Sequence, residues 1–144
     1  WGDPLAFHYD NARKAPHKFR PQYNLATELG IRGRLDEAET YLERALAIDP
    51  DFSEAHNQLG NVYLLRGELD AAIRQYRRAV ALQPRNAVAW YNLGQSLERR
   101  GDRAGAVHSY RRFLDTAPPD MAGYGAQIRA RIRRLSPSAP ETDR

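Results

Sequence analysis

At 144 residues the chain is long enough for one domain or a short array of repeats, and 42% of its residues are hydrophobic, enough to build a core. It contains no cysteine, which excludes disulfide bonds and thiolate metal sites. The 22 basic and 18 acidic residues mix along most segments and leave a formal net charge of +4. Such mixing is typical of solvated helix faces, so we expect no nucleic acid as a partner.

No apolar stretch reaches the roughly 20 residues of a membrane-spanning helix, and the first residues show no signal-peptide pattern. We therefore expect a soluble segment that does not itself insert into a membrane. The chain begins at Trp1 and not at Met, which indicates excision or processing from a longer protein. Without cysteine its location stays unknown, because cytoplasm and periplasm both fit the composition.

Four residue types recur along the chain with one common period, the interval from Pro16 to Pro50. They are Pro16, Pro50, Pro84 and Pro118; Gly33, Gly67 and Gly101; Leu25, Leu59 and Leu93; and Ala38, Ala72 and Ala106. Each period contains two amphipathic stretches of about fourteen residues, one before the glycine and one between the glycine and the proline. A glycine permits the left-handed conformation that ends many helices, and a proline cannot continue a helix. The period therefore predicts repeated antiparallel helix pairs.

The first predicted element is a helix from Pro4 to Lys14. Asp3 can cap it, and Pro4 stands in its first turn. Pro16 is in phase with the period, so this helix occupies the position of the second helix of a repeat. The first helix of that repeat is missing. Residues 1–18 are therefore predicted to form a half-repeat that closes the near end of the array.

Three full repeats follow, at residues 19–52, 53–86 and 87–120. The second contains Leu59, Gly60, Tyr63, Gly67, Ala72, Tyr76, Ala79 and Pro84. At these offsets the sequence resembles the tetratricopeptide repeat. The third repeat keeps Trp90, Leu93, Gly94, Ala106, Tyr110 and Pro118, with Leu97 for the tyrosine and Phe113 for the second alanine; the first has Ala26 for the glycine and Leu42 for the aromatic residue.

The resemblance implies an all-α fold, a right-handed superhelical stack of antiparallel helix pairs. Small residues such as Gly60 and Ala79 would let paired helices approach closely, while Tyr63, Tyr76 and Trp90 would fill the space between layers. Phe113 stands where a small residue is expected, so the last layer should depart from the regular geometry.

The last predicted element is a capping helix over residues 121–135. Its apolar stripe consists of Met121, Tyr124, Ile128, Ile132 and Leu135. The arginines of this segment lie mostly off the stripe, on a face that we expect to be solvated. Residues 136–144 are rich in proline and serine, and we expect them to be disordered.

The sequence offers no recognisable catalytic or cofactor site. No two of His8, His17, His56 and His108 have the helical spacing of a zinc site, so no metal is expected. The periodic glycines occur singly and end helices, unlike those of a phosphate-binding loop. No serine has a base near it in a nucleophile motif. We therefore expect a protein that is not an enzyme and that binds no cofactor.

The remaining candidate site is the concave face that stacked repeats form with their first helices, which in this family receives peptides. Asn24, Gln58 and Asn92 lie one period apart from one another, and their side-chain amides can both donate to and accept from a peptide backbone. The predicted peptide-binding residues are Tyr23, Asn24, Thr27, Asn57, Gln58, Asn61, Tyr91, Asn92 and Gln95.

Two functions follow from this interpretation. The first is a scaffold that binds another polypeptide in the groove. The second comes from about the first two dozen residues, which resemble the junction after the last membrane helix of bacterial transmembrane-and-tetratricopeptide proteins of the O-mannosyltransferase-like type. That resemblance implies an extracytoplasmic arm presenting substrates to a membrane-bound glycosyltransferase-like enzyme. A third possibility is a homo-oligomer formed through the end helices.

Overall fold

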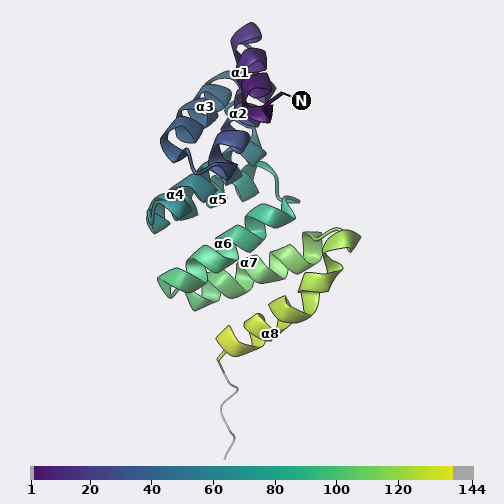
Figure 1. Ribbon diagram of the computed structural model, residues 1–144. Coiled ribbons are helices and arrows are strands. Elements are labelled where there is room, and N and C mark those ends of the chain that lie inside the picture. The colour runs from purple at the N-terminus through teal and green to yellow at the C-terminus, as the bar shows by residue number, and fades with distance from the viewer. Residues whose placement is uncertain (1, 138–144) are drawn as a thin grey trace, which may run out of the picture. The chain divides into compact units, whose positions relative to one another are not determined.

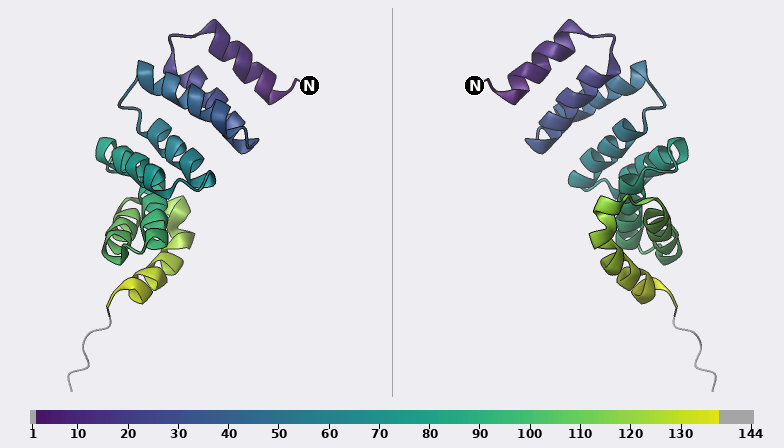
Figure 2. Two further views of the ribbon diagram at one scale, coloured as in Figure 1. Left: turned by 90° about the vertical axis from the view of Figure 1, so that its left-hand side faces the viewer. Right: turned by 90° about the vertical axis from the view of Figure 1, so that its right-hand side faces the viewer.

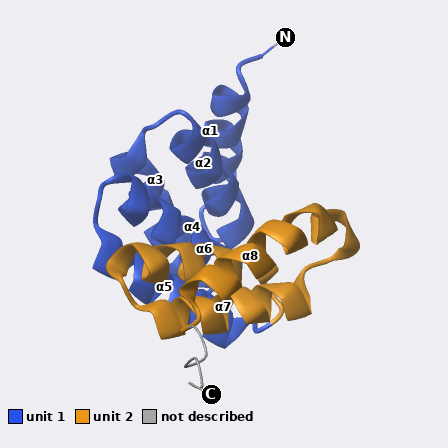
Figure 3. Ribbon diagram, turned by 90° about the horizontal axis from the view of Figure 1, so that it is seen from below, with its two compact units in different colours: residues 1–84 blue, residues 85–144 orange. Residues whose placement is uncertain are grey.

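The computed structural model describes residues 2–137, and within that range the chain is all-α (Figure 1). The helices are α1 (Pro4–Lys14), α2 (Phe19–Ile31), α3 (Leu35–Ile48), α4 (Ser53–Leu65), α5 (Leu69–Leu82), α6 (Ala87–Arg100), α7 (Arg103–Thr116), the 3₁₀ helix η1 (Pro119–Tyr124) and α8 (Gly125–Leu135). Trp1 and most of the tail for which disorder is expected, residues 138–144, lie outside the described residues. The chain divides into two compact units, residues 1–84 and residues 85–144 (Figure 3).

The period of the sequence appears directly in where the helices begin. The first helices of the repeats begin at Phe19, Ser53 and Ala87, and the second helices at Leu35, Leu69 and Arg103. Between the members of each pair stands a glycine with positive φ, 73° at Gly33, 79° at Gly67 and 89° at Gly101. A side chain with a Cβ rarely adopts this conformation, so the chain reverses direction where the periodic glycine allows it.

In the first unit, α2 pairs with α3 and α4 pairs with α5, while α1 packs on α2 and α3 packs on α4 (Figures 1 and 2). The core consists of aliphatic side chains, alanines and the buried rings of Phe52 and Tyr76, which face one another across these pairs. Leu25, Leu29, Ala38 and Ala55 have no exposed surface. The hydrophobic effect of this burial holds the helices of the unit together.

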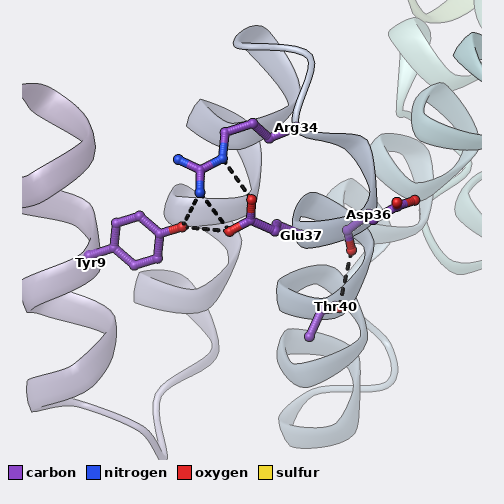
Figure 4. Close-up of polar contacts among 5 residues, drawn as sticks. All are labelled: Tyr9, Arg34, Asp36, Glu37 and Thr40. Carbon is purple, nitrogen blue, oxygen red and sulfur yellow. Dashed lines mark hydrogen bonds and ion pairs between the residues drawn. The ribbon is translucent and has the colours of Figure 1, made fainter.

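The half-repeat helix α1 spans the residues for which the sequence predicts a helix. The Asp3 carboxylate caps it, accepting a hydrogen bond of 3.0 Å from the backbone amide of Leu5. At mid-helix the Tyr9 hydroxyl donates to Oε2 of Glu37 on α3 at 2.8 Å (Figure 4). Arg34 donates to both oxygens of the same carboxylate, at 2.7 and 2.8 Å, which holds the pKa of Glu37 below its usual range. A polar cluster thus ties α1 to the first repeat.

The second unit contains the pair α6 and α7, followed by η1 and by α8, which packs on α7. The sequence predicts one capping helix over residues 121–135, and this is wrong for its first turn. Residues 119–124 form a 3₁₀ helix, and the α-helix begins only at Gly125. Pro119 lacks an amide hydrogen, and Gly123 and Gly125 are poor helix formers, so this segment supports only a short, tight helix. Met121 and Tyr124 therefore lie outside the α-helical stripe.

The Glu98 carboxylate joins α6 to α7 and α8. It accepts hydrogen bonds from the Tyr110 hydroxyl and from Arg134, both at 2.7 Å, and Arg131 lies near it. Burial acts to raise the pKa of Glu98, but these hydrogen bonds and the arginine charges outweigh burial and hold it below the ordinary 4.5. The carboxylate is therefore stabilised in its charged form.

We expect this network to stabilise the fold at neutral pH and to fail in acid. A lowered folded-state pKa contributes stability above the unfolded-state pKa, and that stability is lost as the pH falls through the folded-state value. Glu98→Gln should lower the free energy of unfolding by roughly 1 kcal/mol at pH 7. The difference from wild type should shrink as the pH falls below 4.5 and vanish once the pH lies below the folded-state pKa of Glu98. Urea titrations followed by circular dichroism between pH 3 and pH 7 measure both effects. A difference independent of pH would show that the charge is not involved.

Candidate functional site

The exposed faces of α2 and α4 form the candidate site in the first unit. Positions i, i+4, i+7 and i+11 share one side of a helix, and α2 and α4 lie in contact with each other. These positions form one row of side chains on each helix. The row on α2 consists of Arg20, Asn24, Thr27 and Ile31, and the row on α4 consists of Glu54, Gln58, Asn61 and Leu65. Each row therefore begins with a charge, continues with side chains that form hydrogen bonds and ends with a large aliphatic residue.

A pocket of about 310 Å³ lies between these two helices. It is lined by Ala26, Thr27, Gly30, Ile31, Leu42, Gln58, Asn61, Val62 and Leu65. Three of the predicted peptide-binding residues are therefore brought together here, namely Thr27, Gln58 and Asn61. We call this the repeat-1 pocket.

Hydrogen bonds hold the polar side chains of the repeat-1 pocket in place. The Tyr76 hydroxyl donates to Oδ1 of Asn61 at 2.7 Å, and Nδ2 of Asn61 donates to Oε1 of Gln58 at 3.1 Å. The Thr27 hydroxyl donates to the backbone oxygen of Tyr23 at 3.0 Å. Asn24 is exposed and makes no side-chain hydrogen bond within residues 2–137. These bonds give the pocket a fixed pattern of polar groups before any partner arrives.

Two other predicted peptide-binding residues of this unit, Asn57 and Tyr23, pack against neighbouring side chains of the protein. Asn57 is only 7% exposed, so it is a buried side chain of α4. The Tyr23 ring packs edge-on against Phe52, with the ring centroids 4.9 Å apart, and is half-buried. The spacing in the sequence placed both on the inner side of the first helices, but neighbouring side chains cover them.

The repeat-1 pocket lies where the first repeat departs from the other two. In the second repeat the buried Tyr76 ring packs against Gly60 so closely that a Cβ at Gly60 would fall 2.5 Å from the ring. Tyr110 and Gly94 make the same fit in the third repeat, where the distance would be 2.7 Å. The first repeat has Leu42 and Ala26 at these positions, and both line the pocket. The sequence shows that Ala26 and Leu42 replace the glycine and the tyrosine, but it does not show that they border an open space.

The second unit has a pocket of its own on the face of its first helix. It measures about 340 Å³ and is lined by Val88, Tyr91, Asn92, Phe113, Met121 and Tyr124. The centroid of the Tyr91 ring lies 5.6 Å from that of Phe113 and 6.5 Å from that of Tyr124, and Nε2 of Gln95 donates to the Tyr91 hydroxyl at 2.8 Å. Tyr91 and Asn92 belong to the predicted set. Met121 and Tyr124 were missed because η1 was not foreseen, although Phe113 signalled an irregular last layer.

Charges near the repeat-1 pocket are already paired. Arg32, which follows Ile31, donates to Glu28 at 2.7 Å and to Asp3 at 2.6 Å. Arg66, which follows Leu65, pairs with Asp36 and with Glu39. Glu39 also accepts from the Tyr63 hydroxyl, and burial together with that carboxylate raises the pKa of Tyr63 to about 12. None of the nine pocket-lining residues is charged.

A further pocket in the first unit, of about 970 Å³, lies away from the predicted face. It is bordered by α1 and α3, with Tyr9, Asp10, Arg13, Tyr41, Arg44 and Ile48 among its lining residues. It contains none of the nine predicted residues. Within residues 2–137 no group of acidic or histidine side chains is arranged to hold a metal ion. None of the helices in the described range is both long and apolar enough to cross a membrane.

Three family models match the sequence. A tetratricopeptide repeat model matches residues 31–77, a TPR repeat model residues 60–101 and a further tetratricopeptide repeat model residues 88–119. No curated protein matches the chain in sequence.

Solved structures share the fold. YrrB, a TPR protein with an unusual peptide-binding site, has a TM-score of 0.78 at 19% identity over 89% of this chain and 63% of its own. MamA has a TM-score of 0.72 at 20% identity over 91% and 84% of the two chains. The Yersinia enterocolitica type III secretion chaperone SycD, solved with a peptide of the translocator YopD, has a TM-score of 0.74 at 16% identity over 81% and 90%. At these identities the likeness is one of fold.

Proposed function

Because the chain contains tetratricopeptide repeats, we propose that it is a scaffold that binds a segment of another polypeptide on the faces of its first helices. Stacked helical hairpins present extended surfaces because each repeat contacts only its neighbours and leaves one side of its first helix uncovered. Two of the proteins with this fold bind peptides: SycD was solved with a peptide of YopD, and YrrB has an unusual peptide-binding site. They support the class of partner, a polypeptide.

The observation that carries the proposal is the position of the pockets. The pocket on the first-helix side of each unit contains predicted peptide-binding residues, Thr27, Gln58 and Asn61 in the first unit and Tyr91 and Asn92 in the second. Pockets formed by side chains and a periodicity read from the sequence are independent indications. They favour the same faces.

The amide positions supply a means of recognising a peptide without reading its sequence. Asn24, Gln58 and Asn92 occupy the same place on α2, α4 and α6. A carboxamide can donate to a backbone carbonyl and accept from a backbone amide, which suits an extended chain. The role of these residues would be to hold the partner's backbone, while the pockets beside them would receive its side chains.

Replacing Asn24, Gln58 and Asn92 together with alanine should weaken peptide binding roughly ten- to thousandfold, since each lost hydrogen bond costs about 0.5–1.5 kcal/mol. The thermal midpoint should hardly change, because none of the three side chains is buried. Peptides recovered from a displayed library and titrated by fluorescence anisotropy provide the measurement. The matched control is Arg77→Ala with Arg78→Ala, two exposed positions on the second helix α5. A triple variant that folds and binds every recovered peptide as tightly as wild type would rule this face out.

A further inference from the structure

The last residues of α2 and α4, Ile31 and Leu65, form an aliphatic surface that is unusual for a face in contact with water. Ile31 is 77% exposed and Leu65 is 68% exposed, and both line the repeat-1 pocket. The corresponding position of the third repeat, one period further along, is Arg99. Large aliphatic side chains that stand in water beside a pocket mark a surface that gains from being covered. The pocket has apolar walls from Ala26, Leu42 and Val62 in addition.

We propose that the repeat-1 pocket receives an aliphatic side chain of the bound polypeptide, so that the scaffold selects segments carrying leucine, isoleucine, valine or methionine at one position. This inference rests on the proposed function, and it names the class of partner that the first unit takes. The pocket volume of about 310 Å³ lies at the lower end of the roughly 300–1,000 Å³ that ligand sites span, which suits a side chain and not a folded domain.

The pocket offers no free charge to pair with, which favours an uncharged side chain as its occupant. No lining residue carries a charge, and the arginines that follow the two aliphatic residues are already paired, Arg32 with Glu28 and Asp3, and Arg66 with Asp36 and Glu39. A charged side chain entering here would lose its water and find no partner. An aliphatic side chain would remove its own surface and that of Ile31 and Leu65 from water.

The polar residues of the pocket favour a polypeptide over a free hydrocarbon. Gln58 and Asn61 line the same pocket as the aliphatic residues, so amides stand beside apolar walls. An amino-acid residue in an extended chain has the complementary arrangement, a backbone amide next to its side chain. The chain's own tail is a poor occupant, because residues 136–144 contain no leucine, isoleucine, valine or methionine.

Gly30 offers a way to fill the pocket from within. It lines the pocket, it lies inside α2, and a Cβ added there would meet no atom within 4 Å. Gly30→Leu therefore places a leucine side chain in the open space. Leucine is a better helix former than glycine, so the thermal midpoint should rise or stay unchanged. Arg74→Leu, at an exposed position on α5, is the matched control for adding a leucine to the surface.

A second variant fills the same pocket by another route. Ala26→Gly with Leu42→Tyr introduces the pair that the other two repeats use, Gly60 with Tyr76 and Gly94 with Tyr110. The glycine is required, because a tyrosine ring in that position leaves no room for a Cβ. If either variant fails to fold by circular dichroism, the other still tests the proposal.

The experiment selects binders from a displayed random peptide library with the full chain. We expect one peptide position to be enriched in aliphatic residues, and we expect the selected peptides to bind Gly30→Leu at least tenfold more weakly than wild type and Arg74→Leu unchanged. Peptides that bind both pocket-filling variants like wild type, or that carry charged residues at the enriched position, would overturn the pocket assignment and leave the proposed function standing. Recovery of no peptide at all would overturn both. Self-association of the chain that disappears in Gly30→Leu would assign the pocket to a second copy and also overturn the proposal.

Discussion

Replacing Tyr76 with alanine should lower the free energy of unfolding by about 3–5 kcal/mol, the range for a large core aromatic whose space cannot collapse. The Tyr76 side chain has no exposed surface, and its ring lies directly against Gly60. Its hydroxyl also donates to Asn61 at 2.7 Å, so the substitution removes both packing and a hydrogen bond. Urea denaturation of the full chain, followed by circular dichroism, measures the loss.

The control for this prediction lies at the next position of the same helix. Arg77 is exposed, and Arg77→Ala should change the free energy of unfolding by no more than about 0.5 kcal/mol. Tyr76→Phe keeps the ring and removes only the hydroxyl, so it should cost about 1 kcal/mol. Equal effects of Tyr76→Ala and Arg77→Ala would mean that the repeat register is wrong.

Two glycine-to-alanine substitutions on first helices should have opposite signs. Gly60→Ala should destabilise the protein by about 1–3 kcal/mol, because the new methyl group would fall 2.5 Å from the Tyr76 ring and force helix or ring to shift. Gly30→Ala should stabilise it by roughly 0.5–1 kcal/mol, because the methyl group meets open space and alanine favours the helix. Thermal and urea denaturation of the two variants provide the comparison.

A double variant isolates the cause of the Gly60 effect. In a Tyr76→Leu background, Gly60→Ala should cost much less than it does alone, since the first repeat already combines Ala26 with Leu42. In this double-mutant cycle the cost of Gly60→Ala is measured relative to Tyr76→Leu alone, so the stability lost through Tyr76→Leu cancels. Costs that add without coupling would show that the tyrosine ring is not what excludes a methyl group at Gly60.

The positions of the helix pairs could be predicted from the sequence because their signals are local. The periodic glycines take positive φ, and the paired helices begin at the same interval that separates those glycines. Asp3 and Pro4 mark the start of α1 through contacts within one turn. The prediction of a helix over residues 121–135 failed at residues 121–124, where the apolar spacing suited an α-helix but proline and glycine favoured the 3₁₀ helix. The backbone preferences of proline and glycine outweigh the apolar spacing in this segment.

Only part of the candidate site could be predicted from the sequence. Spacing along a helix determines which side chains share a face, and so the rows through Asn24 and Gln58 could be written from the sequence alone. It does not determine what covers that face. Asn57 and Asn61 lie one helical turn apart on α4, yet Asn57 is 7% exposed while Asn61 lines a pocket and accepts from Tyr76.

The sequence by itself determined the repeat, its period, the turns and the faces of the first helices, because each depends on residues within a few turns of one another. Only the tertiary structure decided where the surface is hollow. The repeat-1 pocket exists between side chains of α2, α3 and α4 that are distant in the sequence, and its shape depends on how Leu42, Val62 and Leu65 pack together. A pocket is the space that neighbouring elements leave between them, and no residue pattern on a single helix specifies that space.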